Sequence, residues 1–261
     1  MSFNFAKYLE EAYVSVGALD FDVIYLYTDF RTFGTHVSAF PSRAAFMQAV
    51  IEPFLERGRT VITPTFTYTT EGDFQIRTTP TFLGAFNKWI LQQPDHVRSE
   101  HPLFSFAALG PRAEEFMRDV GKSAFGWDSV HDRLHGQKVG FLHVGRPIEL
   151  GNTALHYVEQ RCGASYRIHK AFSTRVLRGE QYVGTDYTAF LRRRDVEGQN
   201  FAFTFREAAA LLKKQGWVRE FGSVAEFTNI SCYPFDQTLS FLSSLFYEDQ
   251  TIFIETNFIQ R

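Results

Sequence analysis

The sequence predicts one α/β domain, built on a mixed β-sheet with helices on both faces. The chain has 261 residues, which is long enough for a single large domain to bury a core. Strand-like and helix-like segments alternate through the first 160 residues, as in a sheet covered on both faces. The later half is richer in strand-like segments, which favours a mixed sheet over a purely parallel one. No repeat or linker interrupts the chain, so residues 1–261 are expected to form this one domain.

The N-terminal quarter of the chain predicts two helices and two strands in alternation. Residues 3–16 have the apolar period of an amphipathic helix. Residues 21–27 are apolar and rich in β-branched and aromatic side chains, as in a buried strand. A helix is then expected to begin at Pro41-Ser42, with apolar residues at four-residue spacing, namely Phe46, Val50 and Phe54. A short strand follows over residues 60–63.

The remaining elements are predicted from the same signals. Thr79 and Pro80 form a cap and first-turn pair, which predicts a helix through about Gln92. Further helices are predicted over residues 111–120, 128–134, 152–161, 205–215 and 235–246. Strands are predicted over residues 138–144, within 166–190 around a turn at Gly179, and over 251–255.

The charge balance and the cysteine content exclude several classes of protein. With 27 basic and 29 acidic side chains, the net charge is −2 and provides no basic surface for nucleic acid or an anionic membrane. Two cysteines argue against a disulfide framework. The N-terminal segment lacks a signal-peptide pattern, and no run approaches the ~20 apolar residues that span a bilayer. A cytoplasmic protein without nucleic-acid or membrane partners is therefore expected.

Phenylalanine is unusually frequent, with 29 copies. A phenylalanine-rich core is the favoured interpretation, because single apolar residues at a surface are normal and need no special role. Exposed aromatic surface used for self-association is the alternative, so a homodimer stays open as a prediction.

Several chemical motifs are absent or weak. The sequence has neither a phosphate-binding glycine loop nor a G-x-S-x-G nucleophile elbow. Cys162 is interpreted as a small buried hydrophobe rather than a nucleophile. His131 and His135 share one face of a predicted helix, but no third ligand is evident, so a solvated face is favoured over a metal pair. No metal is therefore expected.

Two segments contain the residues best suited to catalysis. The first spans residues 98–108, and the second spans residues 151–159 and opens a predicted helix. In the second, Asn152 is a good N-cap, and His156 and Glu159 share a helix face because they are three residues apart. A carboxylate beside an imidazole fixes its tautomer and raises its basicity, and free N–H groups at the helix start can stabilise an oxyanion. From spacing alone, an ordinary surface His/Glu pair is still favoured.

The two segments together resemble the signature of the aminoglycoside 3-N-acetyltransferase family, the non-GNAT antibiotic acetyltransferases. RSEHPLFSFAALG is similar to its Arg-Ser-x-x-Pro-x-x-Ser segment, and GNTALHYVE to its Asn-Thr-x-x-His-x-x-Glu helix. The resemblance covers about residues 20–170 and implies the non-GNAT acetyltransferase fold and the acylation of an amine. Four other segments occur in the family's order, namely VIYLYTDFRTFG, TVITPTFTY, TTPTFLG and FGWDSVHDRLHGQKVGFLHVG.

The resemblance also implies roles for individual positions. His156 corresponds to the family's base for the acceptor amine, and Glu159 to its acidic partner. Thr153 and Asn152, at the helix start, are implied to polarise the acyl carbonyl. The implied co-substrate is acetyl-CoA or another acyl-CoA, with no metal. The implied cleft for coenzyme A and the acceptor includes Asp29, Arg31, Thr65, Arg98, Ser99 and Ser105.

The chain departs from the family pattern at two places. Tyr27-Thr28-Asp29 stands where many members have His-Ser-Ser, which leaves the contacts to coenzyme A open. A carboxylate there could instead bind an ammonium group or sugar hydroxyls. His143 replaces a small residue at the end of its strand, and a satisfied core histidine is favoured over one that narrows the pocket.

The acceptor is the least determined part of the expected function. Aminoglycosides are polycations, which favour an acidic cleft and surface, whereas this chain is nearly neutral. We therefore expect the amine of an amino sugar, in particular a nucleotide-linked one used for cell-surface polysaccharide, ahead of an aminoglycoside antibiotic. A metal-dependent amidohydrolase and a non-catalytic binding protein are the alternatives from other classes.

Overall fold

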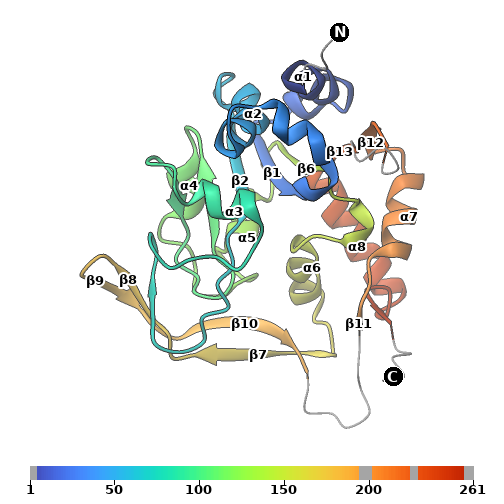
Figure 1. The fold of residues 1–261 in the computed structure, drawn as a ribbon. Helices are drawn as coiled ribbons and strands as arrows, with labels where there is room; N and C mark the ends of the chain where they lie inside the picture. Colours follow the sequence, from blue (N-terminus) through green and yellow to red (C-terminus); the bar gives the residue numbers. More distant parts are fainter. Residues whose placement is uncertain (1–4, 194–201, 224–228, 256–261) are drawn as a thin grey trace, which may run out of the picture.

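The main sheet has seven strands, with β1 at its centre. The structure, a computed structural model, describes residues 5–193, 202–223 and 229–255. The strand order is β12-β13-β6-β1-β2-β5-β4 (Figure 1). Strand β1 (Val23–Thr28) pairs in parallel with β2 (Thr60–Pro64) and β6 (Val139–Val144), whereas the outer pairs are antiparallel. The predicted mixed sheet is confirmed, and its outer strands are β4 (Val97–Arg98), β5 (Phe106–Leu109), β12 (Arg219–Phe221) and β13 (Ile230–Pro234).

Helices cover both faces of this sheet. Successive strand residues point to opposite sides, and both sets of side chains on β1 are apolar or aromatic and buried. Ile24 and Leu26 belong to one apolar cluster, which includes residues of α1 (Phe5–Ser15), α2 (Arg43–Leu55) and α3 (Ala85–Ile90). Tyr25 and Tyr27 belong to the other cluster, on the opposite face. That face is covered by α4 (Ala113–Met117), α5 (Val130–Leu134), α6 (Ala154–Cys162), α7 (Arg206–Lys214) and α8 (Phe235–Glu248).

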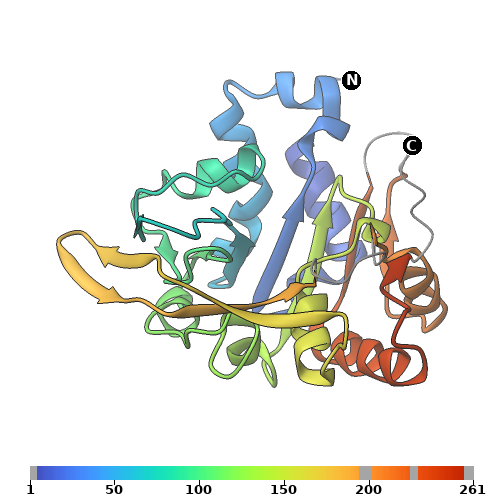
Figure 2. The same cartoon turned by 90° about the horizontal axis from the view of Figure 1, so that it is seen from below.

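The strands predicted within residues 166–190 form a long ribbon beside the main sheet. Strand β7 (Arg167–Phe172) pairs antiparallel with β10 (Tyr187–Arg192). Between them, β8 (Arg175–Arg178) and β9 (Gln181–Gly184) form a hairpin that turns at Gly179, whose φ is 64°. Figures 1 and 2 show the ribbon running along one side of the molecule and ending in this hairpin. Three further short strands pair outside the main sheet: β3 (Asp73–Gln75) joins β8, and β11 (Ala202–Phe203) pairs with β14 (Ile254–Glu255).

Three short 3₁₀ segments connect these elements. They are η1 (Ala18–Asp20), η2 (Phe30–Ala39) and η3 (Ile148–Leu150). Segment η2 follows β1 directly and contains Gly34 at a φ of 45°, in the left-handed region that favours glycine. The first residues of η2, Phe30 and Arg31, line a cavity at the end of the central strand.

Two predicted helices are shorter than expected. The helix predicted over residues 111–120 is limited to Ala113–Met117. The helix expected from Thr79-Pro80 begins only at Ala85, so the prediction is wrong over residues 79–84. The hydroxyl of Thr79 accepts a hydrogen bond from the Gln75 amide at 2.8 Å, and the hydroxyl of Thr81 donates to the carbonyl of Phe66 at 2.8 Å. These side chains hold the loop against its neighbours instead of capping a helix.

The predicted solvated pair of histidines is also wrong. Helix α5 ends at Leu134, so His135 lies beyond it and is exposed. His131 is fully buried, and its Nε2 lies 3.0 Å from the hydroxyl of Tyr25. The two imidazoles therefore do not share a helix face, and His131 belongs to the core beneath α6.

The distribution of phenylalanine agrees with the core interpretation. Among the described phenylalanines, only Phe82 and Phe203 are exposed. The others belong to the two apolar layers on either side of the sheet, except Phe74, which lies in a small third cluster with residues of the ribbon. In the part of the chain that the structure describes, no helix combines the length and the apolar character needed to cross a bilayer.

Candidate active site

The largest cavity near the predicted catalytic residues lies at the carboxyl ends of the parallel strands. Its volume is about 720 Å³. Tyr27 to Arg31 line it from the end of β1, and Pro64 and Phe66 from the end of β2. Arg146 lines it from the turn after β6, and Thr153 lines it from the start of α6.

The topology explains why a cavity forms there. The chain leaves β1 through α2 to reach β2 on one side, whereas β6 pairs with β1 on the other side. Helices α2 and α6 pack on opposite faces of the sheet. The connections therefore diverge at the end of β1, which is the place where ligands bind in open α/β sheets.

The start of α6 is held against β1 by side-chain hydrogen bonds. The Oγ1 atom of Thr153 lies 2.9 Å from the hydroxyl of Tyr25 and 2.9 Å from that of Tyr27. Asn152 acts as a local cap, since its Oδ1 accepts a hydrogen bond from the Ala154 amide at 3.0 Å. Its amide nitrogen donates to Tyr233. Thr153 thus faces the cavity with a fixed hydroxyl, whereas Asn152 is buried and braces the turn.

His156 and Glu159 form the pair that their spacing predicts. Nδ1 of His156 lies 2.6 Å from Oε2 of Glu159. The imidazole side chain is 23% exposed, while the carboxylate is fully buried. His156 is one helical turn after Thr153, but it is not among the residues that line the 720 Å³ cavity. Its ring packs instead against Phe125 and Phe203, at centroid distances of 5.4 and 6.0 Å.

The surroundings of Glu159 favour its ionised form. Burial raises the pKa of Glu159, but His156, Arg167 and Tyr166 together lower it below its usual value. The hydroxyl of Tyr166 donates to Oε1 at 2.8 Å, and Nε of Arg167 lies 2.8 Å from Oε2. A buried carboxylate with these partners remains charged at neutral pH.

The position of the proton on His156 follows from its two neighbours. Nη2 of Arg167 lies 3.0 Å from the same Nδ1 that contacts Glu159, and arginine has no acceptor atom. Nδ1 can either accept from Arg167 or donate to Glu159. Because Glu159 is ionised and only 2.6 Å away, it is the acceptor, so Nδ1 carries the proton. The lone pair is therefore on Nε2, as a general base requires.

The structure places Asp29 and Arg31 at the mouth of the cavity. Asp29 accepts from the guanidinium of Arg31 through both carboxylate oxygens, at 2.9 and 2.6 Å. These hydrogen bonds lower the pKa of Asp29, which keeps it ionised. Arg146 adds a second guanidinium on the wall, with Nη2 donating to the carbonyls of Leu150 and Gly151. The charged side chains on the wall are thus two arginines and one aspartate.

Four residues expected at the cleft lie in a buried polar network behind the cavity wall. Thr65, Arg98, Ser99 and Ser105 are at most 2% exposed, and none of them lines the 720 Å³ cavity. The carbonyl of Thr65 accepts from Nη2 of Arg98 at 2.7 Å and from the hydroxyl of Ser105 at 2.9 Å. Because Pro64 and Phe66 line the cavity on either side of Thr65, the network fixes the shape of that wall.

Arg98 satisfies several carbonyl groups at once. Its Nη1 donates to the carbonyls of Ile76 and Thr79, at 3.2 and 2.5 Å, and its guanidinium lies 5.0 Å from the ring centroid of Phe74. Burial lowers the pKa of Arg98 to about 9, so it is still protonated at neutral pH. A guanidinium that bridges three loops in this way has a structural role that the sequence pattern alone does not distinguish from ligand binding.

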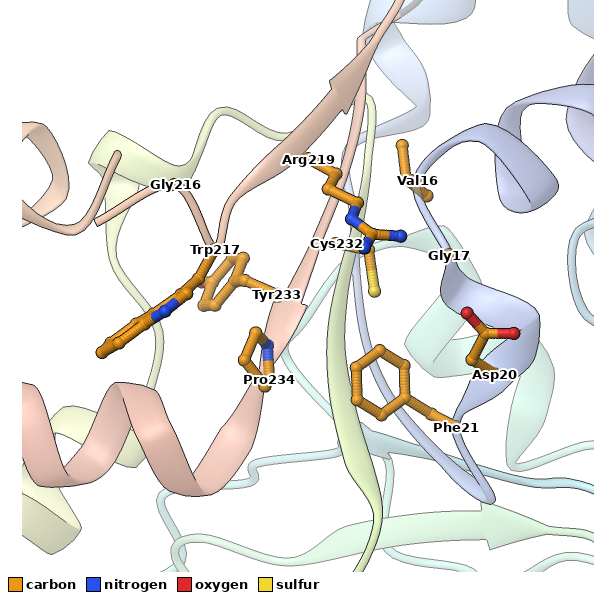
Figure 3. Close-up of a pocket in the computed structure, with 10 residues that line it drawn as sticks. All are labelled: Val16, Gly17, Asp20, Phe21, Gly216, Trp217, Arg219, Cys232, Tyr233 and Pro234. Carbon is orange, nitrogen blue, oxygen red and sulfur yellow. The ribbon is translucent and has the colours of Figure 1, made fainter. Parts of the chain in front are cut away.

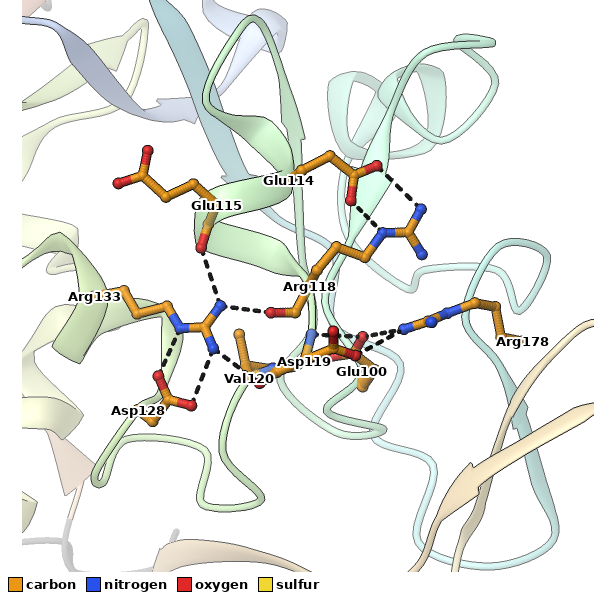
Figure 4. A network of polar contacts seen from close by, with 9 residues as sticks. All are labelled: Glu100, Glu114, Glu115, Arg118, Asp119, Val120, Asp128, Arg133 and Arg178. Carbon is orange, nitrogen blue, oxygen red and sulfur yellow. Dashed lines mark hydrogen bonds and ion pairs between the residues drawn. The ribbon is translucent and has the colours of Figure 1, made fainter.

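Glu100, two residues after Arg98 in the same motif, also has a structural role. The buried carboxylate of Glu100 accepts from the amides of Asp119 and Val120, at 3.1 and 3.2 Å. It also accepts from Arg178 of the β8–β9 hairpin at 2.7 Å, as Figure 4 shows. Beside it, Arg133 donates to the carbonyls of Glu115, Arg118 and Asp119. The motif therefore ties the ribbon and the α4–α5 segment to the sheet.

His143 and His131 are both core histidines, and each has its Nε2 within hydrogen-bond distance of a tyrosine hydroxyl. A core position was the favoured interpretation for His143. Nε2 of His143 lies 2.9 Å from the hydroxyl of Tyr233, and its ring lies 5.1 Å from that of Tyr27. Burial lowers the pKa values of His131 and His143 to about 3. Neither imidazole is charged at neutral pH.

Four residues of this site were not predicted from the sequence, and Tyr27 was noted only as part of a departure from the family pattern. Tyr25 was visible only as an apolar strand residue, although the alternation on β1 places Tyr25 and Tyr27 on the face of α6. Arg146 follows a strand that was predicted, and its position at a carboxyl strand end was a usable signal. Tyr166 and Arg167 follow α6 after a turn, and no spacing rule indicates that they return to Glu159.

Two other observations limit the chemistry of the described residues. Within residues 5–193, 202–223 and 229–255, no three His, Cys, Asp or Glu side chains group in a way that could hold a metal ion. A second cavity, of about 220 Å³, lies between the α1–β1 connection and strands β12 and β13. Figure 3 shows Arg219 and Asp20 on its wall and Cys232 at its back, with no histidine among its ten lining residues.

Comparison with known families gives one match. The model of the family described as aminoglycoside 3-N-acetyltransferase matches residues 29–239, which is most of the chain and includes Thr153, His156 and Glu159. A search of the curated proteins finds no match.

Solved structures share the fold at low sequence identity. Aminoglycoside acetyltransferase AAC(3)-IIb is 18% identical with a TM-score of 0.72, over 94% of this chain and 97% of the other. The apoenzyme of AAC(3)-IVa is 21% identical with a TM-score of 0.68, over 94% and 90%. The YokD protein from Bacillus subtilis is 16% identical with a TM-score of 0.67, over 92% and 99%. These likenesses establish the fold of the present chain.

Proposed function

The chain belongs to the aminoglycoside 3-N-acetyltransferase family, and from this premise we propose that it is an acyl-CoA-dependent N-acyltransferase. One observation supports the proposal above all others. The imidazole of His156 is held by an ionised Glu159 at 2.6 Å, one helical turn after a threonine that lines a cavity. A base with a fixed tautomer next to a polar hydroxyl is the arrangement that acyl transfer to an amine requires.

The cavity is suited to the acyl arm of coenzyme A. Its volume of about 720 Å³ is within the usual range for small-molecule sites, and its wall is partly apolar through Pro64, Phe66 and Phe86. Arg146 and Arg31 provide cationic groups for phosphate oxygens near the mouth. Bound there, acyl-CoA would supply the activated acyl group. We infer that Thr65, Arg98, Ser99 and Ser105 act indirectly, by fixing the wall.

Residues in α6 and at its start have distinct roles in the proposed reaction. Nε2 of His156 takes the proton of the acceptor amine, and Glu159 stabilises the imidazolium that results. The hydroxyl of Thr153 donates to the carbonyl oxygen as it gains negative charge. The amine nitrogen forms the new amide bond, the carbon–sulfur bond breaks, and the sulfur leaves as a thiolate that takes up a proton. Positioning and electrostatic stabilisation provide most of the rate in such a mechanism.

Two classes of acceptor remain as candidates, an aminoglycoside and a nucleotide-linked amino sugar, and membership of the family favours the aminoglycoside. An aminoglycoside amine is the first candidate, because the family carries that name. Structures of AAC(3)-IVa with gentamicin and of AAC-VIa with sisomicin show that similar folds bind such compounds. A nucleotide-linked amino sugar is the second candidate. It is favoured by the two arginines on the cavity wall, since only one carboxylate, that of Asp29, accompanies them.

A thiol-release assay with acetyl-CoA tests the function and separates the acceptors. The panel contains aminoglycosides on one side and UDP- and dTDP-amino sugars on the other. We expect acceptor-dependent thiol release that a chelator does not reduce, with faster release for the aminoglycosides. Release only with the nucleotide sugars would favour the second candidate. No release with any amine would support the non-catalytic protein or the amidohydrolase, and a measurement of bound metal separates these two, because only the amidohydrolase requires one.

A further inference from the structure

A chain of four side chains leads from the core to the cavity through Thr153. Nε2 of His131 lies 3.0 Å from the hydroxyl of Tyr25, which lies 2.9 Å from Oγ1 of Thr153. The hydroxyl of Tyr27 lies 2.9 Å from the same Oγ1. Each hydroxyl has one hydrogen, so the direction of each bond depends on its neighbours. The direction at Thr153 decides whether its hydrogen points into the core or into the cavity.

The backbone amide of Thr153 limits the arrangements open to Tyr27. This amide donates to the hydroxyl oxygen of Tyr27 at 3.2 Å. The hydrogen of that hydroxyl can then be donated to Oγ1 of Thr153, which is 2.9 Å away, so that the two residues exchange two hydrogen bonds. In the reverse arrangement, Oγ1 donates to the second lone pair of Tyr27 and the Tyr27 hydrogen points into the cavity.

The direction of the bond between Tyr25 and Thr153 depends on the tautomer of His131. Neutral imidazole has one N–H donor and one acceptor nitrogen. Nδ1 of His131 is buried and has no hydrogen-bond partner among the described residues. A buried N–H without a partner is rarer in proteins than an unsatisfied acceptor, so the hydrogen is favoured on Nε2. Nε2 then donates to Tyr25, which leaves the hydrogen of Tyr25 for one of its two hydroxyl neighbours, Thr153 or Tyr27.

The protons of this chain do not change over the working pH range. Burial lowers the pKa of His131 to about 3, so its imidazole is neutral. Burial also raises the pKa values of Tyr25 and Tyr27, so both phenols keep their hydrogens. The number of hydrogens in this chain is therefore constant over that range, and only their directions remain to be assigned.

We propose that His131 and Tyr25 are positioning residues that turn the hydroxyl hydrogen of Thr153 toward the cavity. With both tyrosines donating, the two lone pairs of Oγ1 are used, and its own hydrogen must be donated elsewhere. Thr153 lines the cavity, so the open direction is the one in which an acyl carbonyl would lie. The expected effect on catalysis rests on the proposed function, whereas the directions of the hydrogen bonds are independent of it.

The tautomer of His131 provides the first test, and it needs no activity. In ¹⁵N-histidine-labelled protein, long-range ¹H–¹⁵N spectra distinguish a neutral Nε2–H ring from an Nδ1–H ring. The signals are assigned by their loss in His131→Gln, or by their shift in Tyr25→Phe if that variant does not fold. We expect Nε2–H across the working pH range. An Nδ1–H ring would reverse the bonds and overturn the inference, even in a fully active enzyme.

A double-mutant cycle provides the second test. Deleting one hydroxyl in Tyr25→Phe should lower kcat about tenfold, with little change in the KM for acetyl-CoA. In a Thr153→Val background the same substitution should have no further effect on kcat, because both act through one hydrogen. Equal losses in the two backgrounds would mean that Tyr25 acts only through the fold, and would contradict the inference.

Tyr13→Phe is the matched control for this cycle. Tyr13 is also fully buried, and its hydroxyl donates to the carbonyl of Val50 at 2.9 Å on the other face of the sheet. Its loss should leave kcat unchanged. If the wild-type protein shows no acyl transfer, the proposed function fails, while the spectra of His131 still decide the direction of the bonds.

Discussion

Replacing His156 by alanine is expected to lower kcat by ~10²–10⁴-fold, the range for loss of a general base. The variant removes the Nε2 lone pair that takes the proton of the amine, while the ring is partly exposed and contributes little to the core. The KM for acetyl-CoA should change little, because His156 does not line the cavity assigned to the acyl arm. Steady-state thiol release with a saturating acceptor measures both constants.

His135→Ala is the matched control for this prediction. His135 is an exposed histidine beyond the end of α5, and it is not part of the site. Its removal should leave kcat and the KM values unchanged. Turnover close to the wild-type rate in His156→Ala would remove His156 from the role of base, whatever the control shows.

The second large effect is expected at Thr153. Thr153→Val keeps the shape of the side chain but removes the donor to the carbonyl oxygen, which should lower kcat by ~10²–10³-fold. Some of the loss will reflect the hydroxyls of Tyr25 and Tyr27, which then lack their shared partner at 2.9 Å. Circular dichroism and thermal melting establish whether the variant is folded before its kcat is compared.

Thr153→Ser separates the hydroxyl from the rest of the side chain. Serine keeps the oxygen and its hydrogen but loses the methyl group, so kcat should stay within about tenfold of the wild type. A valine variant as active as the serine variant would show that the hydroxyl does not contribute to the reaction. The oxyanion would then have to be stabilised by backbone N–H groups at the start of α6 alone.

Local signals in the sequence were sufficient for the central part of the fold. The apolar run of β1 and that of β6 are visible without any tertiary information. The pair of His156 and Glu159 follows from helix geometry, since residues three apart share a face. Asn152 was predicted as the N-cap, but Thr153 occupies that position, and Asn152 bonds to the Ala154 amide from one residue earlier.

The missed parts depend on contacts between distant segments. Strand β13 pairs with β6 across some ninety residues and ends at a proline, so nothing local marks it as an inner strand. The 79–84 segment has helix-start residues, but the carbonyl of Phe66 and the amide of Gln75 compete for the threonine hydroxyls. Tertiary hydrogen bonds overrode the local preference in that case.

Arg98 illustrates why residue type alone does not assign a site. An arginine next to serines in a motif is equally consistent with binding an anion and with bridging carbonyl groups. Only the register of β4 against β5, which pairs Arg98 with Ala107, places its guanidinium behind the wall. Conversely, Arg146 has no motif of its own, yet the topology places it on the cavity wall.

The position of a bound acyl group shows most directly whether Thr153 donates to the acyl carbonyl in this cavity. A crystal structure with a non-transferable thioether analogue of acetyl-CoA would show where the carbonyl lies. We expect the pantetheine arm in the cavity at the end of β1, with the carbonyl oxygen within about 3.2 Å of Oγ1 of Thr153. We also expect the carbonyl carbon to be open to an amine on the side of His156. An arm bound elsewhere, or a carbonyl beyond hydrogen-bond reach of Thr153, would contradict the proposal.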